Sequence, residues 1–392
     1  MFVEGKMKKL LYMIILMVVV ASLSGCNKIE QEQESKMEVN SVTENEVEAN
    51  NIEESVSGYA ASFPENYTAV VENVEFDMEI VVDADLMREG LISGKATLQK
   101  VNEDIAFEHL FKGISDYEVY TYEGENEFGE TVDSVAYRKP KDTYDIQFTY
   151  GPESSKLGYY GDSYYIKTTF IADTKDERYN ADLFSKEADL SFMSRSEAFR
   201  MVENLLKEIG IEAEYEYVGY ALNYETMQSE EYYEDINGNV DKSAYKGQWS
   251  KEDDSYYFFI NQMYRQLPVY YKYYELFTEV TDMNMPIQAI VAKDGIKEFD
   301  IQKVFTFSEE KEIEEVASIE EIAATVADKF NQILGTGTYE MTEARLYYYV
   351  DVASGQGEYE VKPIWIIKGT EKKGGQSVQI IIDAQNAKEI LP

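Results

Sequence analysis

The alternation of apolar and polar residues that begins at Phe63 limits the fold of this chain more than any other feature. Residues 74–82, for example, read Val-Glu-Phe-Asp-Met-Glu-Ile-Val-Val. Period-two alternation rich in β-branched and aromatic residues predicts strands that bury one face. Similar runs occupy residues 67–71, 94–101, 118–122, 142–149 and 164–171, with Gly, Asp and Asn at the breaks. We therefore expect residues 63–188 to form a β-rich domain.

Two helices are predicted farther along the chain. Ser194-Arg195-Ser196-Glu197 and Ser318-Ile319-Glu320-Glu321 both match a capping box, and apolar residues follow each at helical spacing up to Gly210 and Gly335. A strand is expected after each helix. The similarity predicts a duplicated unit, although such local signals also recur by chance.

The expected fold class is therefore α+β, with the β-rich N-terminal domain followed by a duplicated helix plus antiparallel-sheet half. The first copy would span residues 189–310, with an insertion at about 225–250. The second copy would span residues 311–392.

The first 25 residues have the pattern of an export signal. Lysines at positions 6, 8 and 9 precede an apolar run from Leu10 to Leu23. This run is shorter than the roughly 20 residues that a membrane-spanning helix needs. It ends in Leu23-Ser24-Gly25-Cys26, which resembles the lipobox of bacterial lipoproteins. The resemblance implies removal of residues 1–25 and a diacylglycerol on the sulfur of Cys26. An ordinary secretory signal with an incidental cysteine is the alternative, and Met1 or Met7 could be the start.

Residues 26–62 are expected to form a disordered acidic tether. Nine glutamates and two lysines lie in residues 27–62, which contain almost no large apolar side chains. Such a segment cannot bury enough surface to offset its loss of conformational entropy. A charged helix is the alternative, but no apolar stripe exists to dock it.

The net charge of −39 limits the partners of the chain. A surface this acidic repels nucleic acid and anionic headgroups, so we expect no nucleic-acid partner and attachment to the membrane through the N-terminal lipid. The expected location is the extracytoplasmic face of the cell membrane. The single Cys excludes a disulfide framework and a Cys-based zinc site.

Three segments near the C-terminus follow the helix predicted after Ser318. They are residues 344–348, residues 361–366 with a Pro-x-Trp element, and residues 380–390 with an Asn-Ala turn. In this order they resemble the closing domain of YycI-type and PepSY-like extracytoplasmic proteins. Residues 257–262 and 268–270 extend the similarity, which covers about residues 190–392.

This resemblance implies a non-enzymatic, protein-binding regulator that acts beside an envelope sensor or protease. The chain departs from the family in two respects. The final turn has Ala387 where the family commonly has Gly, and the expected anchor is a lipid in place of a transmembrane helix. The second departure leaves the specific partner open, because YycI-type proteins engage a sensor kinase partly through their membrane helix.

Few residues indicate catalysis. His109, the single histidine, could act as a general base with Glu108 or a distant carboxylate, but no nucleophile motif accompanies it. Glu230-Glu231 and Asp253-Asp254 could be the paired carboxylates of a hydrolase. In a chain with 75 acidic residues such pairs are common. We therefore expect no enzymatic activity and no cofactor.

A weak calcium candidate lies in the predicted insertion. Asp235, Asn237, Asn239 and Asp241 offer oxygens at alternating positions, as calcium loops do. However, the glycine stands at the fourth place instead of the sixth, and Lys246 occupies the twelfth place, where a glutamate is needed. An Asn-Gly turn is the alternative, and we expect no metal site.

Tyrosine is unusually frequent, with 33 residues, many of them adjacent. Neighbouring tyrosines on a strand face opposite sides, so one of each pair can be exposed and can bind protein or glycan. The alternative is that tyrosine simply favours sheets. The candidate contact residues are Trp249, Tyr270, Tyr271, Tyr273, Tyr274, Tyr347, Tyr348 and Tyr349.

Three hypotheses of function follow. The first is a lipid-anchored, non-catalytic interaction or regulatory lipoprotein with an envelope protein as partner. The second is a surface lipoprotein that binds glycan or wall polymer through exposed tyrosines. The third is a carboxylate-based hydrolase.

Overall fold

A computed structural model of the chain describes residues 63–390, apart from 83–89, 126–130, 141–145, 152–155, 162–163, 173–176, 236, 272–284, 333–336 and 353–356. These residues all belong to one compact unit, Ser55–Pro392. The predicted export signal, Cys26 and the tether lie outside the described residues, as do Tyr273 and Tyr274. Within the described part, no helix has both the length and the apolar character to cross a membrane.

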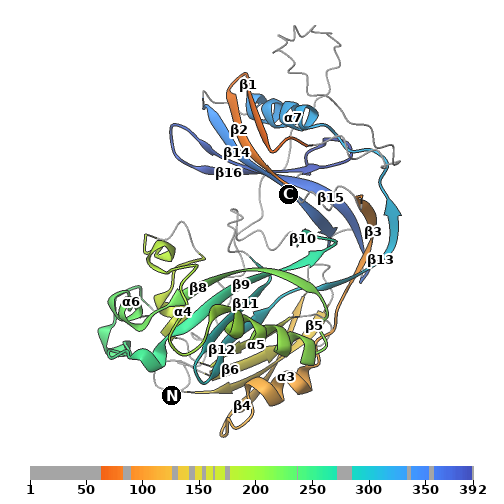
Figure 1. Cartoon of the computed structure of the whole chain (residues 1–392). Coiled ribbons are helices and arrows are strands. Elements are labelled where there is room, and N and C mark those ends of the chain that lie inside the picture. The colour runs from red at the N-terminus through yellow and green to blue at the C-terminus, as the bar shows by residue number, and fades with distance from the viewer. Residues whose placement is uncertain are drawn as a thin grey trace, which may run out of the picture. The chain divides into compact units, whose positions relative to one another are not determined.

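Strands are the most frequent regular element of the described structure (Figure 1). They are β1 Asn66–Val71, β2 Val74–Val81, β3 Ile92–Leu98, β4 Glu118–Glu125, β5 Thr131–Lys139, β6 Ile146–Tyr150, β7 Leu157–Tyr160, β8 Glu214–Leu222, β9 Ser255–Tyr264, β10 Leu267–Tyr270, β11 Ile287–Ala292, β12 Gly295–Ile301, β13 Phe305–Glu312, β14 Tyr339–Asp351, β15 Tyr359–Glu371 and β16 Ser377–Asp383. The helices are α3 Glu103–Leu110, α4 Tyr164–Thr168, α5 Arg195–Glu208, α6 Tyr224–Ser229 and α7 Ile319–Gln332, with 3-10 turns η3 Ala181–Leu183, η4 Lys242–Ala244 and η5 Lys251–Asp253.

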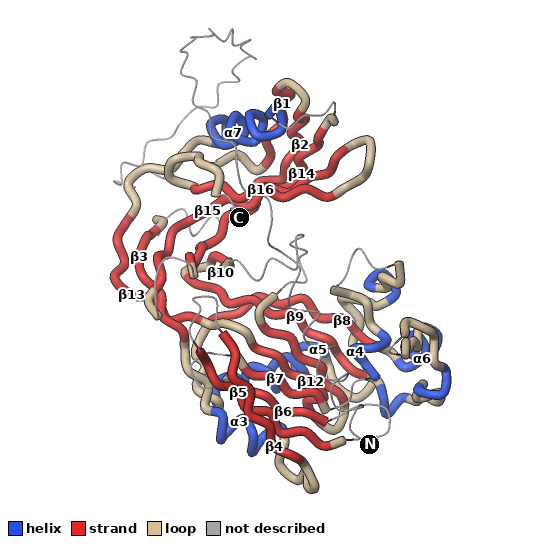
Figure 2. Tube along the Cα trace, turned by 180° about the vertical axis from the view of Figure 1, so that it is seen from behind, coloured by secondary structure: helices blue, strands red, loops and turns tan. Residues whose placement is uncertain are grey.

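The described strands join into one mixed 16-stranded sheet. Its path runs β13-β3-β15-β14-β10-β9-β11-β12-β7-β6-β5-β4, while β2 adds to β14, β1 to β2, β16 to β15 and β8 to β9 (Figure 2). The expected α+β class with a duplicated helix-plus-sheet half is therefore wrong. Hydrogen bonding between strands far apart in sequence merges the expected repeats and the N-terminal strands into a single sheet-dominated structure.

The long hairpin of β14 and β15 connects the parts of this sheet. β14 pairs in parallel with β2 over residues 339–345 and with β10 at Tyr348 and Tyr349. β15 pairs with β3 at one end and with β16 at the other. β2 and β3 come from the first expected domain, β10 from the second, and β14 and β15 from the third, and all of them share this sheet.

The two predicted helices are confirmed as α5 and α7, together with their capping boxes. In α5 the Ser194 hydroxyl accepts from the Glu197 N–H at 3.3 Å, and the Glu197 carboxylate accepts from the Ser194 N–H at 3.1 Å. Ser318 and Glu321 form the same pair of bonds at 3.2 and 2.9 Å. Hydrogen bonds from these serines lower the pKa of Glu197 and of Glu321.

Much of the sheet is covered on both faces. In β9, Phe258 belongs to the core under α5, whereas Tyr257 and Phe259 point to the other face and pack in a cluster with Trp249. α7 lies along β1 and β2 and buries Ile322, Val326 and Phe330 against the β14–β15 hairpin (Figure 1). Strands buried on both faces lose the simple alternation of exposed and buried residues.

One segment that was predicted as a strand is a helix. Residues 164–168 form α4, whose Tyr165 packs edge-on against Trp249 with ring centroids 5.7 Å apart.

The backbone of the final turn explains why glycine is favoured there. Ala387 adopts a φ of 53°, in the left-handed region that favours glycine. The final turn is therefore a place where glycine is the unstrained residue, and this chain carries alanine there instead.

Candidate functional site

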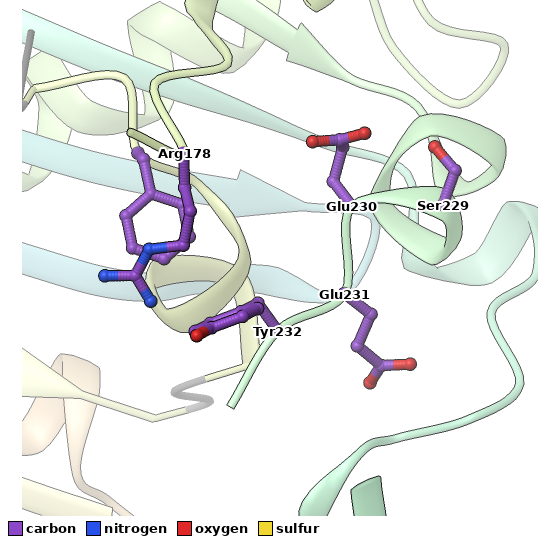
Figure 3. A pocket seen from close by; sticks show the side chains of 6 residues that line it. Arg178, Ser229, Glu230, Glu231 and Tyr232 are labelled. Carbon is purple, nitrogen blue, oxygen red and sulfur yellow. The ribbon is translucent and has the colours of Figure 1, made fainter. Parts of the chain in front are cut away.

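A pocket of about 240 Å³ opens beside Arg178. Phe170, Arg178, Ser229, Glu230, Glu231 and Tyr232 line it (Figure 3). The first two residues follow α4, and the other four come from the end of α6 and the chain after it. Asn223 starts α6 by accepting from the Thr226 N–H at 2.9 Å, and the Glu230 N–H ends it by donating to the Thr226 carbonyl.

Two aromatic rings contact the guanidinium of Arg178. Its guanidinium carbon lies 4.1 Å from the ring centroid of Phe170 and 4.3 Å from that of Tyr232. Its Nη1 lies 3.4 Å from a carboxylate oxygen of Glu234, which also accepts from the Tyr232 hydroxyl. The guanidinium is thus already contacted by two rings, whose centroids lie 6.0 Å apart at an interplanar angle of 80°, and by a carboxylate of its own chain. This arrangement suits a cation–π stack that holds two loops together better than an anion-binding site.

The carboxylates of Glu230 and Glu231 point away from one another (Figure 3). Glu230 accepts from the buried Asn180 amide at 3.4 Å, and Glu231 accepts from the backbone N–H groups of Lys246 and Gly247. Paired catalytic carboxylates must instead face each other across a substrate. The Glu230-Glu231 pair therefore lacks the arrangement that the hydrolase hypothesis needs.

The second acidic pair also serves local structure. Asp253 forms an ion pair with the Lys246 ammonium and caps η5 by accepting from the Ser250 N–H at 2.8 Å. Asp254 accepts from the Tyr224 N–H at 2.8 Å. Burial raises the pKa of Asp254, whereas the Lys246 and Ser250 donors outweigh burial and lower the pKa of Asp253.

The calcium candidate forms a tight turn. One Asp235 oxygen accepts from the N–H groups of Asn237 and Asn239 at 2.8 and 2.9 Å, and Gly238 adopts a φ of 78°. Asp241 accepts from the Ser243 N–H at 2.9 Å. The two carboxylates thus satisfy backbone donors, which is the Asn-Gly turn interpretation. Among the described residues, no group of three or more His, Cys, Asp or Glu side chains is placed to hold a metal ion.

His109 pairs with a distant carboxylate. Its Nε2 lies 2.9 Å from a carboxylate oxygen of Glu208, so the pair joins α3 to the end of α5. Both side chains are about half exposed, and the neighbouring Glu108 pairs with Lys112 at 2.8 Å. An exposed pair between two helices contributes little to stability.

The tyrosine runs expected at the surface are mostly buried. Tyr348 lies in the core under α7, whereas Tyr347 and Tyr349 pack on the opposite face with Ile364 and Ile366. Tyr270 lies beside them, with its ring centroid 6.1 Å from that of Tyr349, and is half-buried. The expectation of an exposed contact is therefore wrong for Tyr347, Tyr348 and Tyr349, because both faces of β14 are covered.

Trp249 and Tyr271 are also buried. Trp249 is 4% exposed and packs against Tyr165, with the Lys246 ammonium 4.7 Å from its ring centroid. Tyr271 packs edge-on against Phe305, with the centroids 5.5 Å apart. The insertion that carries Trp249 folds back over the sheet, so this ring covers the sheet instead of facing a partner.

A partly buried hydrogen-bond network links β7 and β12. The Tyr160 hydroxyl donates to Asp300 at 3.0 Å, and the Gln302 amide donates to the other oxygen of the same carboxylate. Burial raises the pKa of Asp300 and of Tyr160. The network joins strands that already pair in the sheet, and it indicates a structural role.

The exposed aromatic residues of the sheet gather elsewhere, on and beside β4. Tyr117, Val119, Tyr120 and Tyr122 are all exposed, and the rings of Tyr120 and Tyr122 stack with centroids 6.2 Å apart and an interplanar angle of 21°. We predicted this strand but not its exposure. A signal was present, because Glu118-Val119-Tyr120-Thr121-Tyr122-Glu123 lacks a continuous aliphatic face on either side.

Comparison with solved structures finds proteins of similar fold. An uncharacterized protein from Eubacterium rectale superposes with a TM-score of 0.55 at 17% identity, covering 84% of this chain and 94% of that one. The C-terminal domain of Bacillus megaterium YpeB gives a TM-score of 0.28 at 11% identity, covering 74% of this chain and 93% of that domain. The first likeness shows a shared fold, and the second is distant.

No protein-family model matches the sequence, and comparison with curated proteins finds no match.

Proposed function

We propose that this chain is a non-catalytic binding protein of the cell envelope. A lipid on Cys26 would hold it at the extracytoplasmic face of the membrane, and β4 would contact a protein partner. The observation that carries the proposal is the exposure of Val119, Tyr120 and Tyr122 on β4, with the exposed Tyr117 beside the strand. Exposed aromatic side chains that share one strand mark binding surfaces, because their large rings gain much contact area for little loss of entropy.

Two further observations support the non-catalytic part of the proposal. The acidic pairs that suggested a hydrolase accept hydrogen bonds from their own chain, and Glu230 and Glu231 diverge (Figure 3). His109 pairs with Glu208 on an open surface. The tyrosine runs that suggested glycan binding are mostly buried, so a glycan partner is kept as an outcome of the binding test.

Photo-crosslinking in the producing cells tests the proposal. We expect benzoylphenylalanine at Tyr122 of the full-length chain to form a discrete adduct with one protein. The matched control carries benzoylphenylalanine at position 179 instead. Tyr179 is also an exposed tyrosine, but it lies after α4, away from β4 in the sequence. An adduct at both positions, a glycan adduct at Tyr122, or none at Tyr122 would contradict a protein-binding role for β4.

A further inference from the structure

β4 forms an open edge of the sheet. It ends the strand order and, among the described residues, pairs with β5 alone, through eight residue pairs from Glu118–Arg138 to Glu125–Thr131. The outer side of such a strand presents unpaired N–H and C=O groups at every second residue. An extended peptide can pair with these groups and continue the sheet.

Side chains on both faces of β4 are accessible as well. Alternation along the strand places Tyr120 and Tyr122 on one face and Val119 on the other, and all three are exposed. An added strand would therefore find apolar contacts for alternate side chains on each face. Main-chain hydrogen bonds supply affinity in this binding mode, and these side-chain contacts supply specificity.

The opposite end of the strand order is protected in a way that β4 is not. The edge strand β13 has a register shift between Ser308 and Lys311, and Glu309 adopts a φ of 51°. A bulge is one means by which proteins block pairing at an edge. β4 has a regular register throughout.

The acidic residues on and beside β4 indicate which kind of segment can bind at this edge. Glu118, Glu123 and Asp133 are exposed on or beside β4, and Arg138 lies over the Tyr120 ring at 5.4 Å. The chain as a whole carries a net charge of −39. A second copy of β4 would bring its own glutamates to this edge, and residues 27–62 carry nine glutamates against two lysines. Like charges across an interface disfavour both of these occupants.

We infer that β4 binds an extended, lysine- or arginine-rich segment of a partner protein by strand addition. This inference rests on the proposed function and specifies how the partner binds. Backbone pairing would fix the orientation of the segment, and its basic side chains would face the acidic residues of the edge.

A peptide series with the unmodified protein tests the inference. The probe is fluorescein-labelled Lys-Val-Lys-Thr-Lys-Val-Lys-Thr, measured by fluorescence anisotropy. Two further peptides carry N-methyl groups on either the odd or the even residues, because a strand uses only one of these two sets of N–H groups toward β4. We expect one methylated peptide to bind at least about tenfold more weakly than the other. A version with Glu in place of Lys should not bind.

Several outcomes would overturn strand addition. They are equal binding of the two methylated peptides, equal binding of the Glu version, or no binding of the basic peptide at all. Concentration-dependent dimerisation that Tyr120→Glu abolishes would assign the edge to a second copy instead. A protein adduct at Tyr122 combined with equal binding of both methylated peptides would leave the proposed function standing and remove only the pairing mode.

Discussion

Trp365→Ala is expected to lower the free energy of unfolding by about 3–5 kcal/mol. Trp365 is fully buried in the middle strand of β14-β15-β16, opposite Leu346 and Ile382. Its ring packs edge-on against Phe63, with the centroids 4.9 Å apart. Truncation would remove the apolar contacts of a large ring and leave a cavity between the sheet and Phe63. Urea unfolding followed by circular dichroism measures the loss.

Trp365→Phe provides the matched control. The Trp365 Nε1 is buried and has no hydrogen-bond partner among the described residues, so phenylalanine keeps much of the ring and removes an unsatisfied donor. Its cost should be at least about 2 kcal/mol smaller than that of Trp365→Ala. Equal costs for the two variants would show that the ring does not pack as described.

Gln262→Ala is expected to cost about 1–3 kcal/mol, the penalty for a buried polar group left without a partner. The buried Gln262 side chain, on β9, accepts from the Phe305 N–H at 2.9 Å and donates to the Phe305 carbonyl at 2.7 Å. It thereby links β9 to β13, which lie far apart in the strand order. In the variant, the Phe305 carbonyl would still accept from the Gln99 amide at 3.0 Å, whereas the Phe305 N–H would lose Gln262 as its acceptor.

The two tryptophans can report this linkage separately, because the chain contains no others. Trp365→Phe leaves Trp249, which packs on the β9 face, and Trp249→Phe leaves Trp365, which packs between β14 and β16. Both single-tryptophan proteins should unfold at one urea concentration, and adding Gln262→Ala should separate the two transitions. Gln385→Ala, at an exposed site, should change stability by less than about 0.5 kcal/mol. Coincident transitions after Gln262→Ala would contradict its linking role.

Local signals in the sequence predicted individual elements well. The capping serines Ser194 and Ser318 marked both long helices, and period-two alternation marked β1 and β2. These signals depend on neighbours within a few residues, so one chain carries them without reference to the rest of the fold.

The pairing of the strands could not be predicted in the same way. The parallel pairing of β2 with β14 joins Val74 to Tyr339, and no local pattern specifies a partner at that distance. The same limit explains the error over the tyrosines. Whether Tyr347 or Trp249 is exposed depends on which distant segment covers that face, and the alternation rule assumes that one face stays open.

The candidate site shows a similar division. The acidic pairs were recognised in the sequence, but their hydrogen bonds to Lys246, Ser250 and Tyr224 needed the folded loops. The exposure of β4 was not predicted, although residues 118–123 have no continuous aliphatic face on either side.

Thiol labelling in intact cells tests most directly the central claim, that β4 is occupied by a partner outside the cytoplasm. Cys26 is the only cysteine and would be consumed by lipid, so Val119→Cys or Leu183→Cys adds a single free thiol. The two positions are matched, at 56% and 54% exposed. The reagent is a maleimide that cannot cross the cytoplasmic membrane. We predict that it labels both variants when they are purified. In cells we predict that it labels Leu183→Cys, whereas the partner protects Val119→Cys. Equal labelling in cells, or no labelling at either position, would contradict the account.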